Sequence, residues 1–383
     1  MIRPGIFAIG VVLATALVPN IHGFDDLDDL FSDPDTAVEE EEPTPEAVDI
    51  EALTTAPVRF SGSVDMGAGL FIGLNEWTRS NLQDELSPGA GGDMTASFRV
   101  TARPQPYLRV TASIITELDE SEGTFSPPAI EDLFVDYTLR ERVLVRAGTF
   151  GQTWGSARVL NNITNIAGDT DEGVAMRVTV PTPRGTATAL WYTPGGADAL
   201  TYAGQLEASR GRVSGGVAAR VRDQEDLLAT ARLTLGLPRV DLTQEALMRL
   251  DAQDLSDIDT ASVATLSQVV WEVGAPGWLF IGEYLFDGGN SVEAGHHVGV
   301  GVRMPQFLPR GWRPNVQWRH AFVDDSGQIE TALTGNLAPS MEGSIGIPVI
   351  YGPPGSVYRG IDTTIPSNGV VSVGFGARLK FSF

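Results

Sequence analysis

The chain has 383 residues, among them 26 basic residues, 49 acidic residues, 4 histidines and no cysteine. Its formal net charge of −23 argues against a nucleic-acid binder, and the lack of cysteine excludes disulfides and thiolate metal sites. The length allows two soluble domains or one large barrel.

The N-terminus begins with a short apolar segment. Arg3 precedes an apolar run from Ile6 to Val18, which is too short to span a bilayer as a helix. The run has the length of the hydrophobic region of a secretory signal peptide; a buried core helix is the alternative. We therefore expect residues 1–23 to be a signal peptide and the mature protein to leave the cytoplasm.

Residues 24–56 contain 13 acidic residues and no basic one. Such a segment repels itself, so we expect it to be mostly disordered. Phe24, Leu27, Leu30 and Phe31 could line one face of a short helix, which leaves a docking peptide as the alternative to a solvated tail.

From Val58 onward, apolar and polar residues alternate. In the first segment, Phe60 and Val64 share one face of a strand, whereas Ser61 and Asp65 share the other. The segments run about ten residues, the length of a strand that crosses a bilayer at a tilt. Amphipathic helices of useful length do not interrupt them, which argues against a parallel α/β sheet. We therefore treat residues 57–383 as one domain.

The connections between these segments alternate between short turns and long loops, as in transmembrane barrels. The long loops are expected at Asn75–Asp93, Asp119–Pro128, Gly155–Glu172, Asp251–Thr260, Asp287–Glu293 and Gly352–Asn368. We count about eighteen strands, with sixteen as the alternative, including strands at 94–103 and 143–154. The sequence thus predicts an all-β, antiparallel, up-and-down transmembrane barrel.

Charge is divided between the two kinds of connection. The long loops are acidic, whereas the short turns contain a single acid, Glu141, and several arginines: Arg142, Arg184, Arg210, Arg212, Arg239 and Arg310. Because the alternation of lengths does not require this division, it supports two chemically different ends of the barrel.

Aromatic residues gather near the ends of the expected strands. Trp278 and Trp312 each open a strand after a short turn, and Trp271 closes one. His320 falls on the apolar face beside Trp318. These positions favour aromatic girdles at the two membrane interfaces.

The chain ends on an alternating strand. Ala377, Leu379, Phe381 and Phe383 are expected to face lipid. A terminal Phe after such a strand resembles the recognition signal of outer-membrane barrel proteins, and the stretch "VLVRAGTFGQTWGSARVLNNITNI" resembles a segment of diderm outer-membrane porin-like proteins. The resemblance implies an outer-membrane location with the acidic tail in the periplasm, contact with outer-membrane lipid, and assembly by the barrel-assembly machinery through the C-terminal strand. It also suggests a homotrimer and a long inward or extracellular loop.

Charged residues recur on the polar face of the strands. A barrel of this strand number leaves an aqueous channel unless it is plugged, so these residues are expected to set its size and charge preference. The predicted pore-lining residues are Arg99, Arg109, Asp132, Asp136, Arg146, Arg177, Arg220, Arg232, Glu283 and Arg319. We therefore expect passive diffusion of small polar solutes and ions; the alternative is a surface scaffold or adhesin whose lumen is closed by loops such as Gly155–Glu172.

The sequence offers little for catalysis. His296 and His297 are adjacent in a strand and should point to opposite faces, so they cannot chelate one metal together. His297 near Asp287 or Glu293 is the one candidate for a barrel hydrolase, and we expect neither enzymatic activity nor a cofactor.

Overall fold

The computed structural model describes residues 58–383 apart from 75–85, 120–123, 141, 161–165, 168–172, 195–199, 223–225, 252–260, 275–276, 290–293, 307–310, 354 and 359–370. The expected signal peptide and acidic tail lie outside the described residues and stay predictions. Within the described part of the chain, no helix is both long and apolar enough to cross a membrane.

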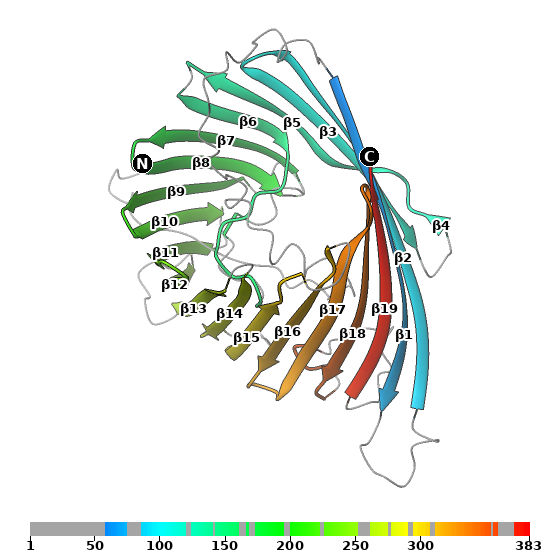
Figure 1. The fold of residues 1–383 in the computed structure, drawn as a ribbon. Helices are drawn as coiled ribbons and strands as arrows, with labels where there is room; N and C mark the ends of the chain where they lie inside the picture. The colour runs from blue at the N-terminus through cyan, green and yellow to red at the C-terminus, as the bar shows by residue number, and fades with distance from the viewer. Residues whose placement is uncertain are drawn as a thin grey trace. The chain divides into compact units, whose positions relative to one another are not determined.

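In the described part of the chain, nineteen strands follow one another, in the order that Figure 1 shows. They are β1 (Val58–Leu74), β2 (Leu86–Gln105), β3 (Leu108–Asp119), β4 (Thr124–Phe125), β5 (Ala129–Leu139), β6 (Val143–Thr149), β7 (Gly173–Thr182), β8 (Gly185–Pro194), β9 (Thr201–Arg210), β10 (Val213–Arg222), β11 (Asp226–Leu237), β12 (Val240–Asp251), β13 (Ser262–Val273), β14 (Trp278–Asp287), β15 (Gly295–Arg303), β16 (Arg313–Ala321), β17 (Ser326–Ala338), β18 (Met341–Tyr351) and β19 (Val371–Ser382).

The strand pairing has no free edge. Successive long strands pair antiparallel, and the last strand, β19, pairs both with β18 and with the first strand, β1. The two-residue β4 pairs only with the end of β3 among the registers that the structure describes. The fold is therefore a closed, antiparallel, up-and-down barrel of 18 long strands, which confirms the predicted fold class and strand number.

Two compact units make up the chain. The first unit contains Glu131–Trp271 and Gly282–Val298; the second contains Leu17–Ile130, Glu272–Ile281 and Gly299–Phe383, as far as their residues are described.

Two strands have boundaries that differ from those expected from the sequence. β2 begins at Leu86, inside the loop expected at Asn75–Asp93, because its ladder with β1 continues past Asp93 until Leu86 lies opposite Leu74. β6 ends at Thr149 instead of residue 154, because the chain leaves the sheet at Phe150.

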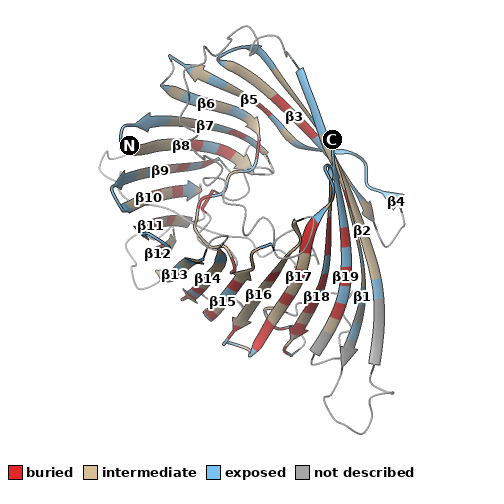
Figure 2. Cartoon of the chain, viewed as in Figure 1, coloured by how far each residue is buried: buried red, intermediate tan, exposed pale blue. Residues whose placement is uncertain are grey.

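Exposed and buried residues follow one another in bands along the strands (Figure 2), as the predicted alternation requires. One face, which we call the outer face, exposes apolar side chains; in β19 these include Leu379, Phe381 and Phe383, and Phe383 is 69% exposed. The opposite, inner face holds the buried polar and charged side chains, such as Arg378 between Ala377 and Leu379. The terminal strand thus has the apolar outward face that its alternation predicts.

A buried ion cluster joins the first and last strands in the second unit. Arg378 of β19 donates from Nε to Asp65 of β1 at 2.5 Å and from a terminal nitrogen to Asp93 of β2 at 2.7 Å. Gly67 leaves room for this cluster, because a Cβ there would lie 2.3 Å from an Asp93 carboxylate oxygen. At the chain end, Phe383 and Gly62 exchange two backbone hydrogen bonds of 3.0 Å.

Candidate inner-face site

The chain after β6 folds onto the inner face of the first unit. We call residues 150–167 the inner loop, of which 150–160 and 166–167 are described. Phe150, Trp154 and Ile166 are buried in one apolar cluster with inner-face residues of the strands, among them Leu190 of β8 and Leu247 of β12. The loop therefore buries apolar surface on the wall of the barrel, which is the main contribution to its position.

A glycine at the root of this loop is required by close packing. Gly148 adopts φ +133°, and a Cβ on it would lie 2.0 Å from the carbonyl oxygen of Leu133 on the neighbouring strand. Any side chain here would separate β5 from β6 just before the chain turns inward.

The carboxylate of Glu283 on β14 holds the middle of the inner loop. Its oxygens accept backbone N–H bonds from Arg158 at 2.6 Å, Val159 at 2.9 Å and Leu160 at 2.8 Å. Gln268 of β13 donates to the same carboxylate at 2.7 Å. Because Glu283 is only 3% exposed, these charge-assisted bonds satisfy an otherwise unstable buried charge.

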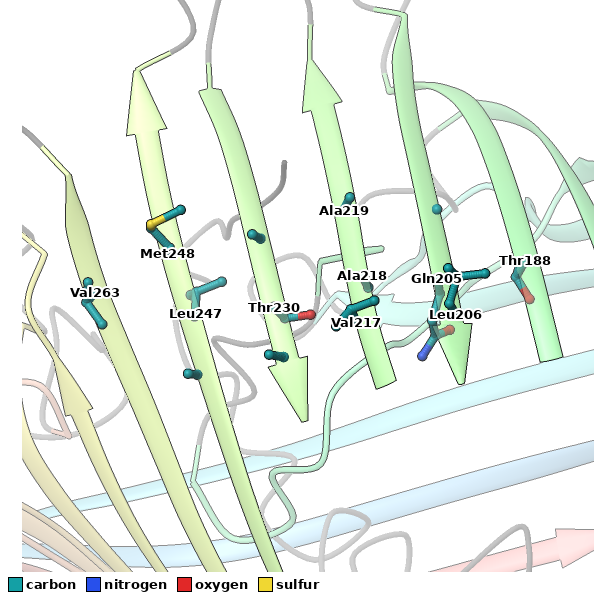
Figure 3. Close-up of a pocket in the computed structure, with 14 residues that line it drawn as sticks. Thr188, Gln205, Leu206, Val217, Ala218, Ala219, Thr230, Leu247, Met248 and Val263 are labelled. Carbon is teal, nitrogen blue, oxygen red and sulfur yellow. The ribbon is translucent and has the colours of Figure 1, made fainter. Parts of the chain in front are cut away.

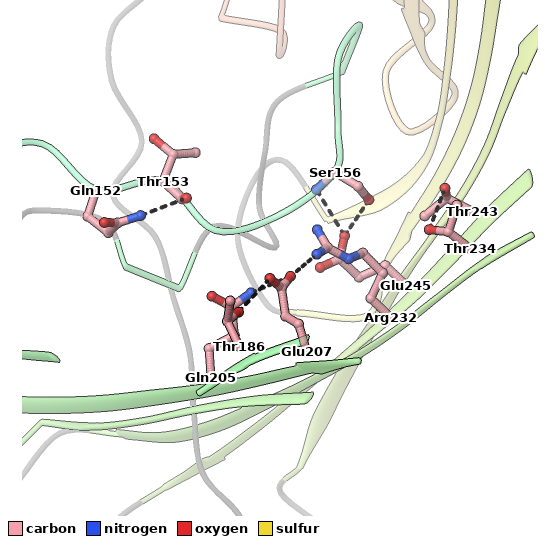
Figure 4. Close-up of polar contacts among 10 residues, drawn as sticks. All are labelled: Gln152, Thr153, Ser156, Thr186, Gln205, Glu207, Arg232, Thr234, Thr243 and Glu245. Carbon is pink, nitrogen blue, oxygen red and sulfur yellow. Dashed lines mark hydrogen bonds and ion pairs between the residues drawn. The ribbon is translucent and has the colours of Figure 1, made fainter. Parts of the chain in front are cut away.

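A second carboxylate holds the inner loop two residues before Arg158 (Figure 4). Glu245 of β12 accepts from the backbone N–H of Ser156 at 3.1 Å and from its hydroxyl at 2.6 Å. Gln268 donates to the carbonyl oxygen of Ser156 at 2.6 Å, so one amide connects both anchoring points. Leu160 completes the attachment by packing with Leu266 and Leu285.

Charges alternate along the inner face next to these anchors. Arg232 of β11 is paired with Glu207 of β9 and lies opposite Glu245 in the β11–β12 register. Thr186 and Gln205 donate hydrogen bonds to the same Glu207 carboxylate (Figure 4). This row therefore offers polar groups of both signs along the wall.

Two arginines lie side by side where the inner loop begins. Arg146 of β6 is directly opposite Arg177 of β7, and like charges in that position repel. Asp136 compensates by accepting from Arg146 at 2.7 and 3.2 Å, and the Arg146 guanidinium lies 4.0 Å from the ring centre of Phe134. Arg177 donates to the side-chain oxygen of Gln152 in the loop.

The structure brings together some of the predicted pore-lining residues and separates others. Asp136, Arg146 and Arg177 form the cluster just described, Asp132 lies on the same strand as Asp136, and Glu283 is the loop anchor. The remaining residues of the first unit are Arg220, which is buried, and Arg232, which is partly exposed; Arg99, Arg109 and Arg319 belong to the second unit. That all ten line a pore stays a prediction.

Four residues that contact or anchor the inner loop, or belong to it, were not among the ten predicted ones: Gln152, Ser156, Glu245 and Gln268. Strand alternation places Glu245 and Gln268 on the inner face, so the sequence does indicate where these two side chains point. For Gln152 and Ser156 the sequence carries no signal, because a loop residue has no periodicity from which a direction follows.

Of the candidate hydrolase residues, Glu293 lies outside the described residues, whereas His297 and Asp287 are described. His296 is exposed and bonded to the Tyr284 hydroxyl at 2.6 Å, whereas its neighbour His297 is buried, which confirms that they point to opposite faces. Asp287 contacts Arg249 at 3.6 Å and the backbone N–H of Gly289. Within the described ranges, no group of three or more histidines and carboxylates is arranged to hold a metal.

A shallow groove also lies over β8–β13 (Figure 3). Its lining includes Leu206, Val217 and Val263, which are exposed, and small residues such as Ala229 and Ala246. Because these side chains belong to the outer face, the groove is separate from the polar inner-face site.

No family model and no curated protein matches the chain. Solved structures do. A BenF-like porin from Pseudomonas fluorescens Pf-5 is 9% identical, with a TM-score of 0.56 over 85% of this chain and 98% of the porin. The outer membrane protein OpdK from Pseudomonas aeruginosa is 8% identical, with a TM-score of 0.53, and OccAB4 from Acinetobacter baumannii is 8% identical, with a TM-score of 0.51; each covers 85% of this chain and 98% of the neighbour. This chain therefore has the fold of the outer-membrane porin barrels.

Proposed function

We propose that the protein is an outer-membrane channel for passive diffusion of small polar solutes and ions. The observation that carries this proposal is the division of the strand faces: apolar side chains cover the outer face, while the inner face holds charges of both signs next to the inner loop. A wall of this composition lets water and ions pass a membrane that the outer face fits.

The inner loop is the segment that we assign to the constriction. Its two anchoring carboxylates and its apolar contacts fix residues 150–160 against the wall instead of leaving them at the rim. The same fixed loop supports the rival function, a scaffold or adhesin with a closed lumen.

Bilayer conductance separates the two functions. The purified full chain, added to a planar bilayer in salt, should give discrete, ohmic conductance steps. Correctly folded barrel that shows heat-dependent gel migration but no steps would refute the channel and favour the scaffold.

We further propose a weak anion preference at high salt that shifts toward cations as salt is lowered. Fixed arginines in a narrow passage are screened less than charges on exposed loops, and Arg146, Arg177 and Arg220 are the candidates for that wall. Reversal potentials across a salt gradient test it: Arg177→Ala should reduce the anion preference. Strong cation selectivity at high salt that Arg177→Ala leaves unchanged would refute it.

The membrane setting belongs to the same proposal. The acidic tail would lie in the periplasm, and the C-terminal strand would engage the barrel-assembly machinery.

For a homotrimer the outer-face groove supplies a candidate contact, because Gln244 and Ser267 share a 2.7 Å hydrogen bond on an exposed surface beside it. Small and polar side chains favour helix packing in membranes, and we extend that reasoning to this face. Crosslinking in native membranes would show whether one, two or three copies associate.

A further inference from the structure

Six arginines occupy four consecutive short turns of the first unit, and we call them the arginine arc. They are Arg140, Arg142, Arg184, Arg210, Arg212 and Arg239, and all are exposed. The turns join β5 to β6, β7 to β8, β9 to β10 and β11 to β12, and the arrowheads of β7 and β9 point to this end in Figure 1. Neighbouring strands lie about 4.8 Å apart, so successive turns are roughly 10 Å apart.

Backbone hydrogen bonds hold three of these turns in place. The N–H of Arg142 donates to Leu139, and the carbonyl oxygens of Arg184 and Arg212 accept from Ser209 and Gly236. Toward the residues that the structure describes, none of the six side chains forms an ion pair or a hydrogen bond. The arc is therefore a row of positive charge that the described part of the chain leaves without ion pairs.

Acidic residues do little to neutralise it. Glu141 stands between two of the arginines in sequence, and Asp241 begins the inner face of β12. In the second unit, the corresponding turns at Gln105–Leu108 and Ala338–Met341 contain no charged residue, and residues 304–312 between β15 and β16 contain one arginine, Arg310. The positive charge is thus concentrated on one set of hairpins.

The arc adjoins the apolar outer face. Exposed aliphatic side chains lie next to three of the turns: Leu139 is 44% exposed, Val213 is 46% exposed and Leu237 is 40% exposed. In a membrane, these residues meet acyl chains while the adjacent guanidinium groups reach the headgroup layer. A ligand that fits this surface has an anionic head and an apolar tail.

We propose that the arginine arc binds anionic phospholipids, with guanidinium groups on the phosphodiester, in the leaflet at the short-turn end of the barrel. Arginine suits this role because its planar fork binds phosphate oxygens in pairs. The acidic segment 24–56 is a competing polyanion, but binding a polyanion does not require the exposed aliphatic residues that lie beside three of the turns. The inference concerns the outer rim and does not depend on conduction through the barrel.

The test compares lipid association in membranes. The full chain is reconstituted in phosphatidylcholine, and the association of spin-labelled phosphatidylglycerol is measured relative to spin-labelled phosphatidylcholine. We expect about fivefold preference for the anionic lipid at low salt, decreasing toward one at high salt. The variant with Arg184→Gln, Arg210→Gln, Arg212→Gln and Arg239→Gln should lose most of it, whereas lysine at the same positions should retain part of it, because lysine keeps the charge but lacks the planar fork.

Two controls make the result decisive. Heat-dependent gel migration shows that each variant is folded, and Tyr107→Gln on a turn of the second unit should leave the preference unchanged. A preference that persists in the glutamine variant overturns the proposal. A preference seen only after deletion of residues 24–56 also overturns it, because the acidic segment would then occupy the arc in the intact chain.

Discussion

The anchor of the inner loop gives the sharpest test of the site. In Glu283→Gln, one of the two carboxylate oxygens becomes an amide nitrogen, which cannot accept the N–H bonds of Val159 and Leu160. A hydrogen bond to a charged group contributes about 1.5–3 kcal/mol, so two lost bonds weaken the anchor by roughly 3–6 kcal/mol. The Glu245 anchor and the Leu160 contacts remain, and we take the lower end. About 3 kcal/mol corresponds to roughly a hundredfold rise in the detached loop.

Limited proteolysis measures directly the rise in the population of the detached inner loop. Trypsin can cut after Arg158 only when the loop detaches, because the N–H groups of the next two residues, Val159 and Leu160, are bound to the Glu283 carboxylate. When closing is faster than cutting, the cleavage rate follows the detached population. The fragment ending at Arg158, followed by mass spectrometry, should therefore appear about a hundred times faster in Glu283→Gln.

The matched control is Glu207→Gln, which removes a carboxylate from the same inner face. Its hydrogen bonds go to Thr186, Gln205 and Arg232 on the wall, so it should leave cleavage after Arg158 unchanged. Equal cleavage rates in the parent and in Glu283→Gln would show that the carboxylate does not hold the loop.

Three further substitutions test the fold. Leu206→Arg, on the outer face at the middle of β9, should lower the yield of folded barrel, because a lipid-facing cation costs about 2–4 kcal/mol. Gln205→Arg, on the inner face, should not lower that yield. Equal yields of the two variants by gel migration would mean that the faces are assigned wrongly. Deletion of the last two residues should reduce assembly in cells, since it removes the paired terminal Phe383; wild-type levels in membrane fractions would contradict this. Arg378→Leu leaves the buried carboxylate of Asp65 and the partly exposed carboxylate of Asp93 without their shared cation and should lower the midpoint of heat unfolding; an unchanged midpoint would mean that the cluster adds nothing.

Period-two alternation explains why the fold was predictable. In β19, each apolar residue from Ala377 to Phe383 is exposed and Arg378 between them is buried, as the alternation requires. The partners of Arg378 were not predictable, because Asp65 lies 313 residues earlier and the pairing depends on closure of the sheet. The start of β2 was missed for a related reason: the glycine-rich stretch before Asp93 reads as a loop, yet its backbone continues the ladder with β1.

The position of the inner loop could not be predicted from strand alternation. Its contacts with the wall make it part of the fold. Leu190, Leu228 and Leu247 lie on the inner face, where a wall lined only by water would hold polar residues, and each is at most 1% exposed. Uncovering one such side chain costs roughly 1.5–3 kcal/mol, so the wall depends on the loop that covers it as much as the loop depends on the wall. This mutual dependence distinguishes the inner loop from a lid, which must leave its site at little cost. Substitutions in Trp154 or Phe150 should therefore change barrel stability and conductance together, whereas a change confined to conductance would be expected of a mobile gate.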